Sequence, residues 1–236
     1  MSTSNSLLIT NKILQEAKQN NIIIISIEGN IAGGKSYLLK QLKGDLGTTI
    51  NNRPIIYKPE PIDIWLNIKD SSGSLLDQYY KNPKENAYKF QTMVLMTMAQ
   101  DLKETIEILK EEPNGGVIIT ERSIYSSHYI FVKMLYDSHL ISEIDYKIYK
   151  MTFEFVMTSG ISFQKILYLN TPVDTCMKRI QSRGRDGEHS ITLNYLKECE
   201  KYHNIFYEKW PNQKEKVSYG ETSLEEIINI LKGFIV

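Results

Sequence analysis

The stretch IEGNIAGGKS, residues 27–36, decides the fold of this chain. It follows an apolar run at residues 22–25 and precedes a segment of helical character. The residues that match the pattern G-x-x-x-x-G-K-[ST] are Gly29, Gly34, Lys35 and Ser36. In this pattern glycines let backbone N–H groups curl around phosphates, the lysine reaches the outer phosphates and the hydroxyl holds Mg²⁺. The full pattern favours a nucleoside triphosphate site over an ordinary glycine turn at the start of a helix.

Short β-branched runs alternate with long segments of helical character along the chain. The predicted strands cover residues 22–27, 55–57, 117–120, 166–169 and 217–219. The predicted helices cover residues 35–43, 84–110, 123–137, 142–159, 173–181, 193–209 and 223–232. Such alternation indicates a parallel sheet covered on both faces, with ligands bound beyond the carboxyl ends of its strands. We therefore expect a single domain over residues 1–236, a three-layer α/β fold of the P-loop NTPase type with about five parallel strands and a small lid.

The composition restricts the partners that this chain can bind. Its 28 basic and 28 acidic residues cancel, so no net field would attract nucleic acid or an anionic membrane. Every apolar stretch is far shorter than the ~20 residues of a membrane-spanning helix, so we expect a soluble protein. Cys176 and Cys199 lack metal-ligand spacing, which is typical of reduced thiols in the cytoplasm. Residues 1–20 contain Glu16 but no arginine, unlike a mitochondrial targeting peptide, and we expect a poorly ordered lead-in.

Two further predicted strands end in charged residues. KPEPIDIW, residues 58–65, places Glu60 between two prolines that restrict its backbone. A carboxylate there has the chemistry to take a proton from an attacking hydroxyl. ITERSIYS, residues 119–126, brings Glu121 and Arg122 to the same edge, where Arg122 would orient Glu60 and Glu121 would reach a metal ion. Taken singly each residue is equally well a solvated cap, but three such strand ends together favour a catalytic site.

Aromatic residues gather in the segments between these strand ends. They are Trp65, Tyr79, Tyr80, Phe90, Tyr125, Tyr129 and Phe131. Most aromatic side chains at such spacing belong to the core, yet a planar base also requires flat apolar walls. In FQTMVLMTM, residues 90–98, the positions that share roughly one helix face are Phe90, Gln91, Val94 and Met98. The amide of Gln91 either caps a buried backbone group or pairs with the edge of a base.

Arginines cluster in KRIQSRGRDGE, residues 178–188. The polar members and the glycine between them are Arg179, Arg183, Gly184, Arg185 and Glu188. The first two arginines share a helix face, and clustered guanidinium groups suit the charge on a transferring phosphoryl group. The alternative is a solvated basic turn. Together with the phosphate-binding pattern, the cluster predicts a lid over residues 183–190.

These motifs in combination resemble one known family. IEGNIAGGKS, EPIDIW, FQTMVLMTM, ERSIYSSHYIF and RIQSRGRDGE occur in the order in which that family carries them, and the likeness runs from about residue 22 to residue 234. The family is that of the deoxynucleoside kinases, which includes deoxycytidine kinase, deoxyguanosine kinase, mitochondrial thymidine kinase and the insect multisubstrate kinases. The resemblance implies transfer of the γ-phosphoryl group of ATP to the 5′-hydroxyl of a deoxynucleoside, with Mg²⁺, for DNA precursor salvage.

The resemblance also implies roles for individual residues. Glu60 would activate the 5′-hydroxyl, Gln91 would pair with the base, and Glu121 would lie near Mg²⁺ with Ser36. The residues implied around the nucleoside are Glu60, Trp65, Tyr80, Phe90, Gln91, Val94, Met98, Arg122, Ser127, Phe131 and Glu188. Those implied around ATP are Gly29, Asn30, Ile31, Ala32, Gly33, Gly34, Lys35, Ser36, Arg179, Arg183, Arg185, Glu221, Thr222 and Ser223. Catalysis would rest on Glu60, Arg122 and Lys35, in a homodimer packed through the helices that follow residues 90 and 123.

Departures from the family pattern bear on the substrate. Members that prefer purines or deoxycytidine place an arginine and an aspartate against the base, where this chain has Met98 and Ser127. With Val94, these residues resemble the uncharged pocket of thymidine-accepting members. We therefore expect pyrimidines, thymidine and deoxycytidine, and leave a broader range open. Gly187 stands where the lid commonly has a second acid, which leaves Glu188 alone for the sugar and predicts a looser lid.

Three other functions fit parts of the same sequence. A nucleoside monophosphate kinase of the thymidylate kinase type shares the phosphate loop but needs a basic clamp for its phosphorylated acceptor. A GTPase switch would use DSSG, residues 70–73, although no N-K-x-D guanine motif accompanies it. A non-catalytic subunit with a kinase fold would have no need of Lys35, Ser36, Glu60 and Arg122 together.

Overall fold

A six-stranded sheet forms the centre of the computed structural model, which describes residues 21–158, 165–185, 187–218 and 220–235. The strands are β1 (Ile22–Gly29), β2 (Thr49–Ile50), β3 (Arg53–Lys58), β4 (Lys69–Asp70), β5 (Gly73–Ser74), β6 (Gly116–Glu121), β7 (Lys165–Asn170) and β8 (Gln213–Ser218). Within the large sheet the order is β2-β3-β6-β1-β7-β8, and every neighbouring pair except β2 with β3 is parallel. β4 and β5 form a separate antiparallel pair. The α/β P-loop fold predicted from the sequence is confirmed.

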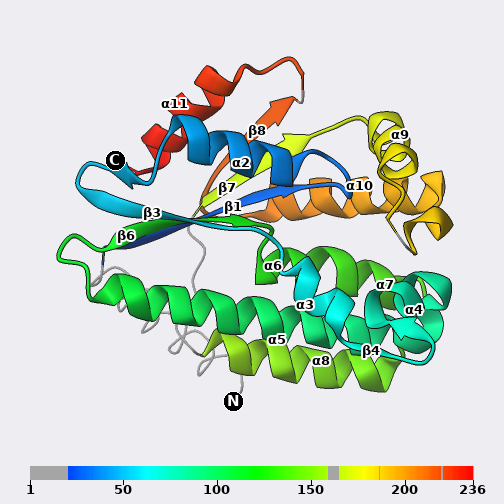
Figure 1. The fold of residues 1–236 in the computed structure, drawn as a ribbon. Helices are drawn as coiled ribbons and strands as arrows, with labels where there is room; N and C mark the ends of the chain where they lie inside the picture. The colour runs from blue at the N-terminus through cyan, green and yellow to red at the C-terminus, as the bar shows by residue number, and fades with distance from the viewer. Residues whose placement is uncertain (1–20, 159–164, 186, 219, 236) are drawn as a thin grey trace.

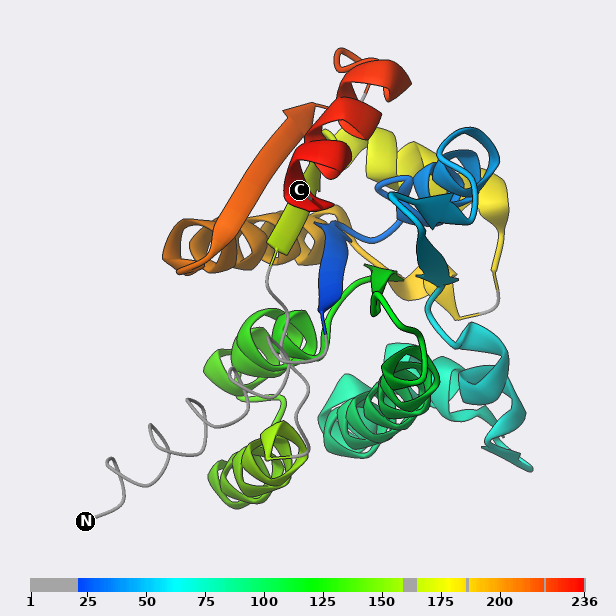
Figure 2. The ribbon, with the colours of Figure 1, turned by 90° about the vertical axis from the view of Figure 1, so that its left-hand side faces the viewer.

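Helices cover both faces of this sheet. They are α2 (Lys35–Asp45), α3 (Ile62–Asn67), α4 (Leu75–Lys81), α5 (Pro83–Lys110), α6 (Ile124–Ser126), the π-helical η1 (Ser127–Val132), α7 (Lys133–Asp137), α8 (Glu143–Met157), α9 (Val173–Arg183), the 3-10 turn η2 (Glu188–Ser190), α10 (Leu193–Lys209) and α11 (Leu224–Ile235). α2 and α11 lie above the sheet as drawn in Figure 1, and α5, α6 and α7 lie below it. α10 shares a core cluster with α5. The turned view shows the same layers, with α8 against α5 at the bottom (Figure 2).

The apolar run of β1 is buried on both faces because successive side chains point to opposite sides of a strand. Ile25 and Ile27 pack in one apolar cluster with Leu42 of α2 and Phe234 of α11. Ile24 belongs to a second cluster on the other face, which includes core residues of α5 and α10. A parallel strand covered on both sides is expected to be apolar throughout, which explains the unbroken run.

Three neighbouring strands bring the charged residues together. β1 pairs with β6, with Ile27 opposite Glu121, and β6 pairs with β3, with Lys58 opposite Thr120. All three run in parallel, so their carboxyl ends meet at one edge. The phosphate loop, the turn that contains Glu60 and the turn that contains Arg122 are therefore adjacent.

Differences from the predicted elements occur where apolar periodicity is short or absent. β2, β4, β5, α3, α4 and η2 are not predicted, and η1 divides the predicted helix at residues 123–137. β8 begins at Gln213 rather than residue 217, because an exposed edge strand is polar and lacks the apolar signal of a central strand. The predicted lead-in at residues 1–20, the strand and helix ends at residues 219 and 159, and residue 186 of the predicted lid lie outside the described residues.

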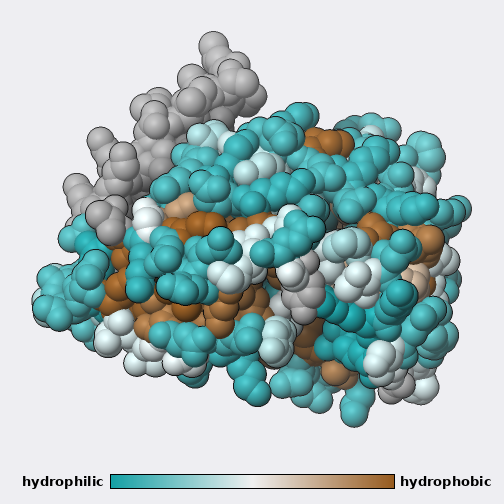
Figure 3. Space-filling model, turned by 90° about the horizontal axis from the view of Figure 1, so that it is seen from above, coloured by the Kyte–Doolittle hydropathy of each residue, from teal (hydrophilic) through white to brown (hydrophobic). Residues whose placement is uncertain are grey.

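Polar and charged side chains cover most of the face over α2 and α11, with smaller apolar areas between them (Figure 3). Within the described part of the chain, no helix is both long and apolar enough to cross a membrane. Cys176 and Cys199 are buried free thiols.

Gly29 occupies a position that tolerates no larger residue, and this gives a test of the fold. Its φ is 154°, and a Cβ added there would lie 2.7 Å from the carbonyl oxygen of Leu169 on β7. We expect Gly29→Ala to lower the free energy of unfolding by about 1–3 kcal/mol in urea denaturation, because the two strands must move apart. The control is Gly44→Ala in α2, where a Cβ meets no atom within 4 Å. That variant is expected to gain about 0.5–1 kcal/mol, and equal stability of the two variants would contradict the prediction.

Candidate active site

The phosphate loop between β1 and α2 is held in shape by its own contacts. Asn30 donates from its amide to the carbonyl of Leu196 at 2.9 Å and accepts from the backbone N–H of Ile31 at 2.8 Å. The hydroxyl of Thr171, which follows β7, donates to the carbonyl of Gly33 at 2.7 Å. These contacts fix the loop at the N-terminus of α2, the end of a helix that attracts anions.

Lys35 is a buried cation that forms no direct ion pair with another described residue. Its side chain is buried and donates to the carbonyl of Asn30 at 2.9 Å. Burial lowers the pKa of Lys35 to about 8, with a further lowering from Arg122, against the opposing effect of nearby Glu60 and Glu121. A phosphate group in the loop would give the ammonium a direct anionic partner.

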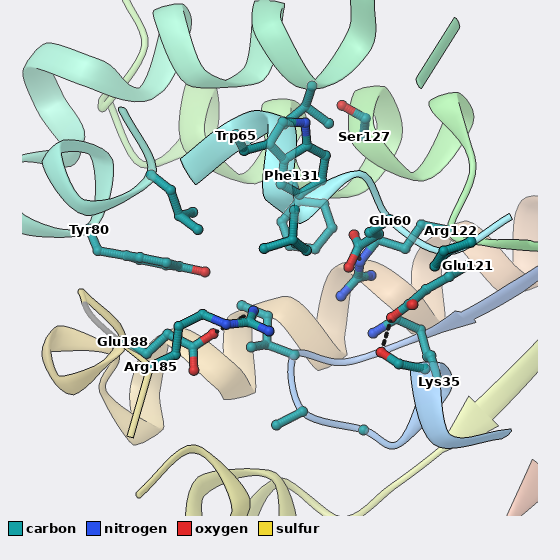
Figure 4. Close-up of a pocket in the computed structure, with 18 of the residues that line it drawn as sticks. Lys35, Glu60, Trp65, Tyr80, Glu121, Arg122, Ser127, Phe131, Arg185 and Glu188 are labelled. Atoms are coloured by element: carbon teal, nitrogen blue, oxygen red, sulfur yellow. Dashed lines mark hydrogen bonds and ion pairs between the residues drawn. The ribbon is translucent and has the colours of Figure 1, made fainter. Parts of the chain in front are cut away.

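Ser36 and Glu121 place two oxygen atoms beside the loop. The hydroxyl of Ser36 donates to Oε1 of Glu121 at 2.8 Å, a contact drawn as a dashed line in Figure 4. Glu121 is the last residue of β6 and is buried. Hydroxyl and carboxylate oxygens are the ligands that Mg²⁺ prefers in proteins.

Glu60 and Arg122 form an ion pair across two strand ends. Nε of Arg122 lies 2.8 Å from Oε1 of Glu60, and both residues face the same cavity as Lys35 (Figure 4). Arg122 has a left-handed backbone with φ of 64°, held by a hydrogen bond from its N–H to the carbonyl of Ile27 at 3.0 Å. Burial raises the pKa of Glu60, and Arg122 opposes that rise. The carboxyl is thus a stronger base than an exposed glutamate, and the ion pair with Arg122 favours its charged form.

His203 of α10 is a second partner of Arg122 that the sequence did not reveal. Its Nδ1 lies 2.6 Å from the carbonyl of Cys199, so Nδ1 carries the proton and donates. Nε2 is then the acceptor for Nη1 of Arg122 at 3.2 Å. Burial lowers the pKa of His203 well below its usual value, so the ring is neutral. The guanidinium also lies 4.7 Å from the centre of the Phe131 ring.

Glu28 holds the residue that follows Arg122 in the chain. This residue of β1 is almost fully buried, and its Oε1 accepts from the hydroxyl of Ser123 at 2.6 Å. Its Oε2 has no hydrogen-bond partner among the described residues. Burial raises the pKa of Glu28. Since Ser123 follows Arg122 directly, this contact fixes the turn that aims the guanidinium.

Aromatic side chains form the walls of the acceptor end. A cavity of about 430 Å³ runs from the phosphate loop to this end. Trp65 lies edge-on to Phe90 at 5.7 Å between ring centres, Tyr79 stacks on Phe90 at 4.7 Å, and Trp65 donates from Nε1 to the hydroxyl of Thr97 at 2.9 Å. Every residue predicted around the nucleoside lines this cavity. Lining residues that were not assigned to the site from sequence are Tyr37, Pro59, Ile62, Leu76, Tyr79, Ser123 and Tyr195.

The predicted lid residues close the other side of the cavity. Arg183 contacts Glu188 through two nitrogen atoms at 2.6 to 3.0 Å, and Arg185 lies 3.2 Å from the same carboxylate. Arg179 donates to the carbonyl of Ala32 in the phosphate loop at 3.2 Å. Glu188 is buried, and its carboxylate is already bonded to Arg183 and Arg185. A sugar hydroxyl would therefore compete with these arginines for the carboxylate. A Cβ at Gly187 would lie 2.9 Å from Asp77 of α4, so the glycine allows the lid to approach α4 closely. The looser lid stays a prediction.

Five residues predicted around ATP do not line the cavity. They are Gly29, Asn30, Glu221, Thr222 and Ser223. The first two shape the loop from behind, whereas the other three follow β8, which β7 separates from β1. Thr222 and Ser223 hydrogen-bond within the turn that starts α11. Their contact with adenine stays a prediction.

The buried charge of Lys35 predicts a measurable effect on stability. A pKa of about 8 against 10.5 means that the ammonium costs roughly 3 kcal/mol at pH 7, of which its hydrogen bond offsets about 1 kcal/mol. We expect nucleotide-free Lys35→Met to have a free energy of unfolding about 2 kcal/mol higher than the wild type in urea at pH 7. The gap should close as pH rises from about 8 towards 10.5, because folded Lys35 is then neutral while the unfolded chain still binds the proton. Lys40→Met, at an exposed position of α2, is the control, and a less stable Lys35→Met at pH 7 would refute the argument.

Comparison with known proteins agrees with this geometry. The family model described as deoxynucleoside kinase matches residues 25–233. Deoxycytidine kinase 2 of Gallus gallus is 34% identical over 215 residues, which cover 83% of this chain and 78% of that protein. Mitochondrial deoxyguanosine kinase of Xenopus laevis is 31% identical over 235 residues, which cover 92% of this chain and 82% of that protein. Deoxycytidine kinase of Homo sapiens is 31% identical over 205 residues, which cover 79% of this chain and 74% of that protein. The chain therefore belongs to the deoxynucleoside kinase family, and its kinase chemistry implies ATP as the phosphate donor.

Proposed function

We propose that this protein transfers the γ-phosphoryl group of ATP to the 5′-hydroxyl of a pyrimidine deoxynucleoside. The observation that carries the proposal is the position of Glu60. Its carboxylate, paired with Arg122 at 2.8 Å, faces the same cavity as the phosphate loop. An acid opposite a bound triphosphate is placed to accept the proton of an attacking alcohol.

The residues divide the reaction between proton transfer and charge stabilisation. Glu60 accepts the proton of the 5′-hydroxyl as the oxygen attacks the γ-phosphorus and the bond to the β-phosphate oxygen breaks. Arg122 holds Glu60 in place and steadies the hydroxyl. Lys35 and the lid arginines neutralise the phosphates, since phosphoryl transfer depends mainly on positioning and electrostatic stabilisation.

The residues beside the phosphate loop fit a magnesium ion. Ser36 and Glu121 are 2.8 Å apart and supply hydroxyl and carboxylate oxygens. Mg²⁺ commonly takes one or two protein oxygens and completes its shell with phosphates and water. Ser36 and Glu121 would hold the ion, which would neutralise phosphate charge when bound.

The far end of the cavity supports a deoxynucleoside as acceptor. Trp65 and Phe90 supply flat apolar walls, and Gln91 supplies an amide for the edge of a base. Tyr80 and Glu188 lie on the side of the drawn site away from Arg122 (Figure 4), and we propose that they hold the sugar 3′-hydroxyl. The related proteins are named deoxycytidine and deoxyguanosine kinases, which supports a nucleoside rather than another alcohol.

The competing functions have weaker support. DSSG at residues 70–73 forms an exposed turn between β4 and β5, where Asp70 accepts from the N–H of Ser72 and the amide of Gln78, and it does not line the cavity. A monophosphate acceptor would bring its own phosphate to a place occupied by the carboxylate of Glu60, which disfavours the thymidylate kinase type. Product analysis with thymidine and with its monophosphate separates these enzymes, and any phosphoryl transfer excludes a non-catalytic subunit.

We infer a homodimer from an apolar stripe on α8. Ile144, Met151 and Phe155 are 71%, 69% and 74% exposed, and with Ile148 they follow helical spacing along one face. Large exposed apolar side chains in one contiguous row are typical of a protein contact surface. The family resemblance implies contacts through the helices that follow residues 90 and 123, and α8 packs against the first of these, α5.

The role of Glu60 can be tested by removing its charge alone. We expect Glu60→Gln to lower kcat by about 10²–10⁴-fold with thymidine and deoxycytidine, because the amide cannot accept the proton. The Kd for ATP, measured by isothermal titration calorimetry, should stay within a few fold. Asp63→Asn, at an exposed carboxylate in the next helix, is the matched control. Turnover of Glu60→Gln within a few fold of the wild type would remove Glu60 from its role.

The stripe on α8 predicts the effect of a charge placed in it. Phe155→Asp should convert the protein from dimer to monomer at micromolar concentration in sedimentation velocity, because a carboxylate would be desolvated in the contact. Lys150→Asp lies off the stripe on the same helix and should leave the dimer intact. A dimeric Phe155→Asp variant, or a monomeric wild type, would exclude this surface.

A further inference from the structure

A buried chain of hydrogen bonds runs behind the base end of the cavity. The hydroxyl of Tyr149 on α8 lies 3.1 Å from the hydroxyl of Ser127. Ser127 in turn lies 3.3 Å from Oε1 of Gln91 and donates to it. Gln91 and Ser127 are each 3% exposed and Tyr149 is 0% exposed. Gln91 and Ser127 line the cavity, whereas Tyr149 stands behind them.

Tyr149 determines which group donates and which accepts in this series of hydrogen bonds. Within the described residues Ser127 is its only hydrogen-bond partner, and burial raises the pKa of Tyr149 so that the phenol keeps its proton. That proton must go to Ser127, because a buried donor without a partner costs about 1–3 kcal/mol. The proton of Ser127 is then left for Oε1 of Gln91. The carbonyl of the amide therefore faces Ser127.

A flip of the Gln91 amide would turn its N–H₂ group towards Ser127. It would break the 3.3 Å hydrogen bond that Ser127 donates to Oε1.

The positions of Ser127, Glu60 and Lys35 in the cavity indicate which atoms of a bound base would meet the amide of Gln91. Ser127 lies at the opposite end of the drawn site from Lys35, with Glu60 between them (Figure 4). The 5′-hydroxyl must reach Glu60, and the 4-position of a pyrimidine lies across the ring from the nitrogen that carries the sugar. The 4-substituent thus points towards Ser127 and meets the carbonyl of Gln91, while the amide N–H₂ faces N3. Cytosine offers a 4-amino donor and an N3 acceptor, whereas thymine offers a 4-oxo acceptor and an N3–H donor.

We propose that Tyr149 determines base specificity by fixing Gln91 through Ser127, so that the site prefers a pyrimidine with a 4-amino group to one with a 4-oxo group. This inference rests on the proposed function and narrows its substrate. Tyr149 acts as a positioning residue, since it reaches the base only through two other side chains.

The test compares 5-methyldeoxycytidine with thymidine as acceptors. The two share the sugar and the 5-methyl group and differ only at N3 and the 4-substituent. We expect the wild type to favour 5-methyldeoxycytidine in kcat/KM by at least about tenfold, as unpaired polar groups cost affinity. Tyr149→Phe should reduce this ratio by about five- to tenfold, chiefly by lowering the KM for thymidine, because Ser127 and Gln91 can then reverse. The KM for ATP should not change.

Two further variants keep the test decisive. Ser127→Ala breaks the chain at its middle and should reduce the ratio in the same direction, which answers the case of a poorly folded Tyr149→Phe. Tyr146→Phe removes a hydroxyl from the same helix and should leave the ratio unchanged. A ratio that stays within twofold in both Tyr149→Phe and Ser127→Ala, or a wild type that prefers thymidine, would overturn the inference. A wild type that phosphorylates neither nucleoside but is active on a monophosphate would instead overturn the proposed function.

Discussion

The guanidinium of Arg122 is the contact on which the rest of the site depends. Three separate parts of the chain converge on it: the turn after β3 through Glu60, α10 through His203, and the π-helical segment through Phe131. The carbonyl of Ile27 on β1 holds the backbone N–H of the same residue. The left-handed backbone at this residue costs on the order of 1 kcal/mol for a non-glycine residue. That strain is sustained because each partner restricts the side chain in a different direction. A base that must meet a hydroxyl within a few tenths of an ångström needs such a fixed neighbour.

Several ionisable groups at this edge of the sheet are buried where the surroundings disfavour their charged forms. Burial lowers the pKa of Lys35 to about 8 and raises the pKa values of Glu28 and Glu60. A protein selected only for stability would replace these groups with apolar residues. Two of these groups would gain partners when a polyphosphate and an alcohol enter the cavity, since the phosphates would pair with Lys35 and the hydroxyl would donate to Glu60.

The acceptor end of the cavity binds its ligand through shape and a few hydrogen bonds rather than through charge. Its walls are apolar and aromatic, and discrimination depends on a few polar atoms whose direction is set from behind. Ser127 and Phe131 are both part of the π-helical segment, where one places a hydroxyl against Gln91 and the other a ring against Arg122. π-helical turns inside longer helices are frequent at functional sites, and here the segment joins base recognition to the catalytic arginine.

Much of the catalytic edge was predictable because its signals are local. The phosphate loop is a contiguous motif, and Glu60, Glu121 and Arg122 each follow a strand whose apolar run marks its end. The lid arginines were found from their spacing. By contrast, His203, Glu28 and Tyr149 gave no usable signal, since a histidine or tyrosine in an amphipathic helix and a glutamate in a strand have many ordinary explanations.

The sequence by itself thus determined the fold type, the phosphate site and the candidate base, because these depend on residues close together in the chain and on the fixed geometry of parallel strands. Only the tertiary structure decided what orients them. The partners His203 and Arg122 are 81 residues apart, and Ser127 and Gln91 are 36 apart. Such contacts form only when α10 and α5 pack against the sheet and η1 packs against α5. The packing of side chains between distant elements leaves no periodic trace in the sequence.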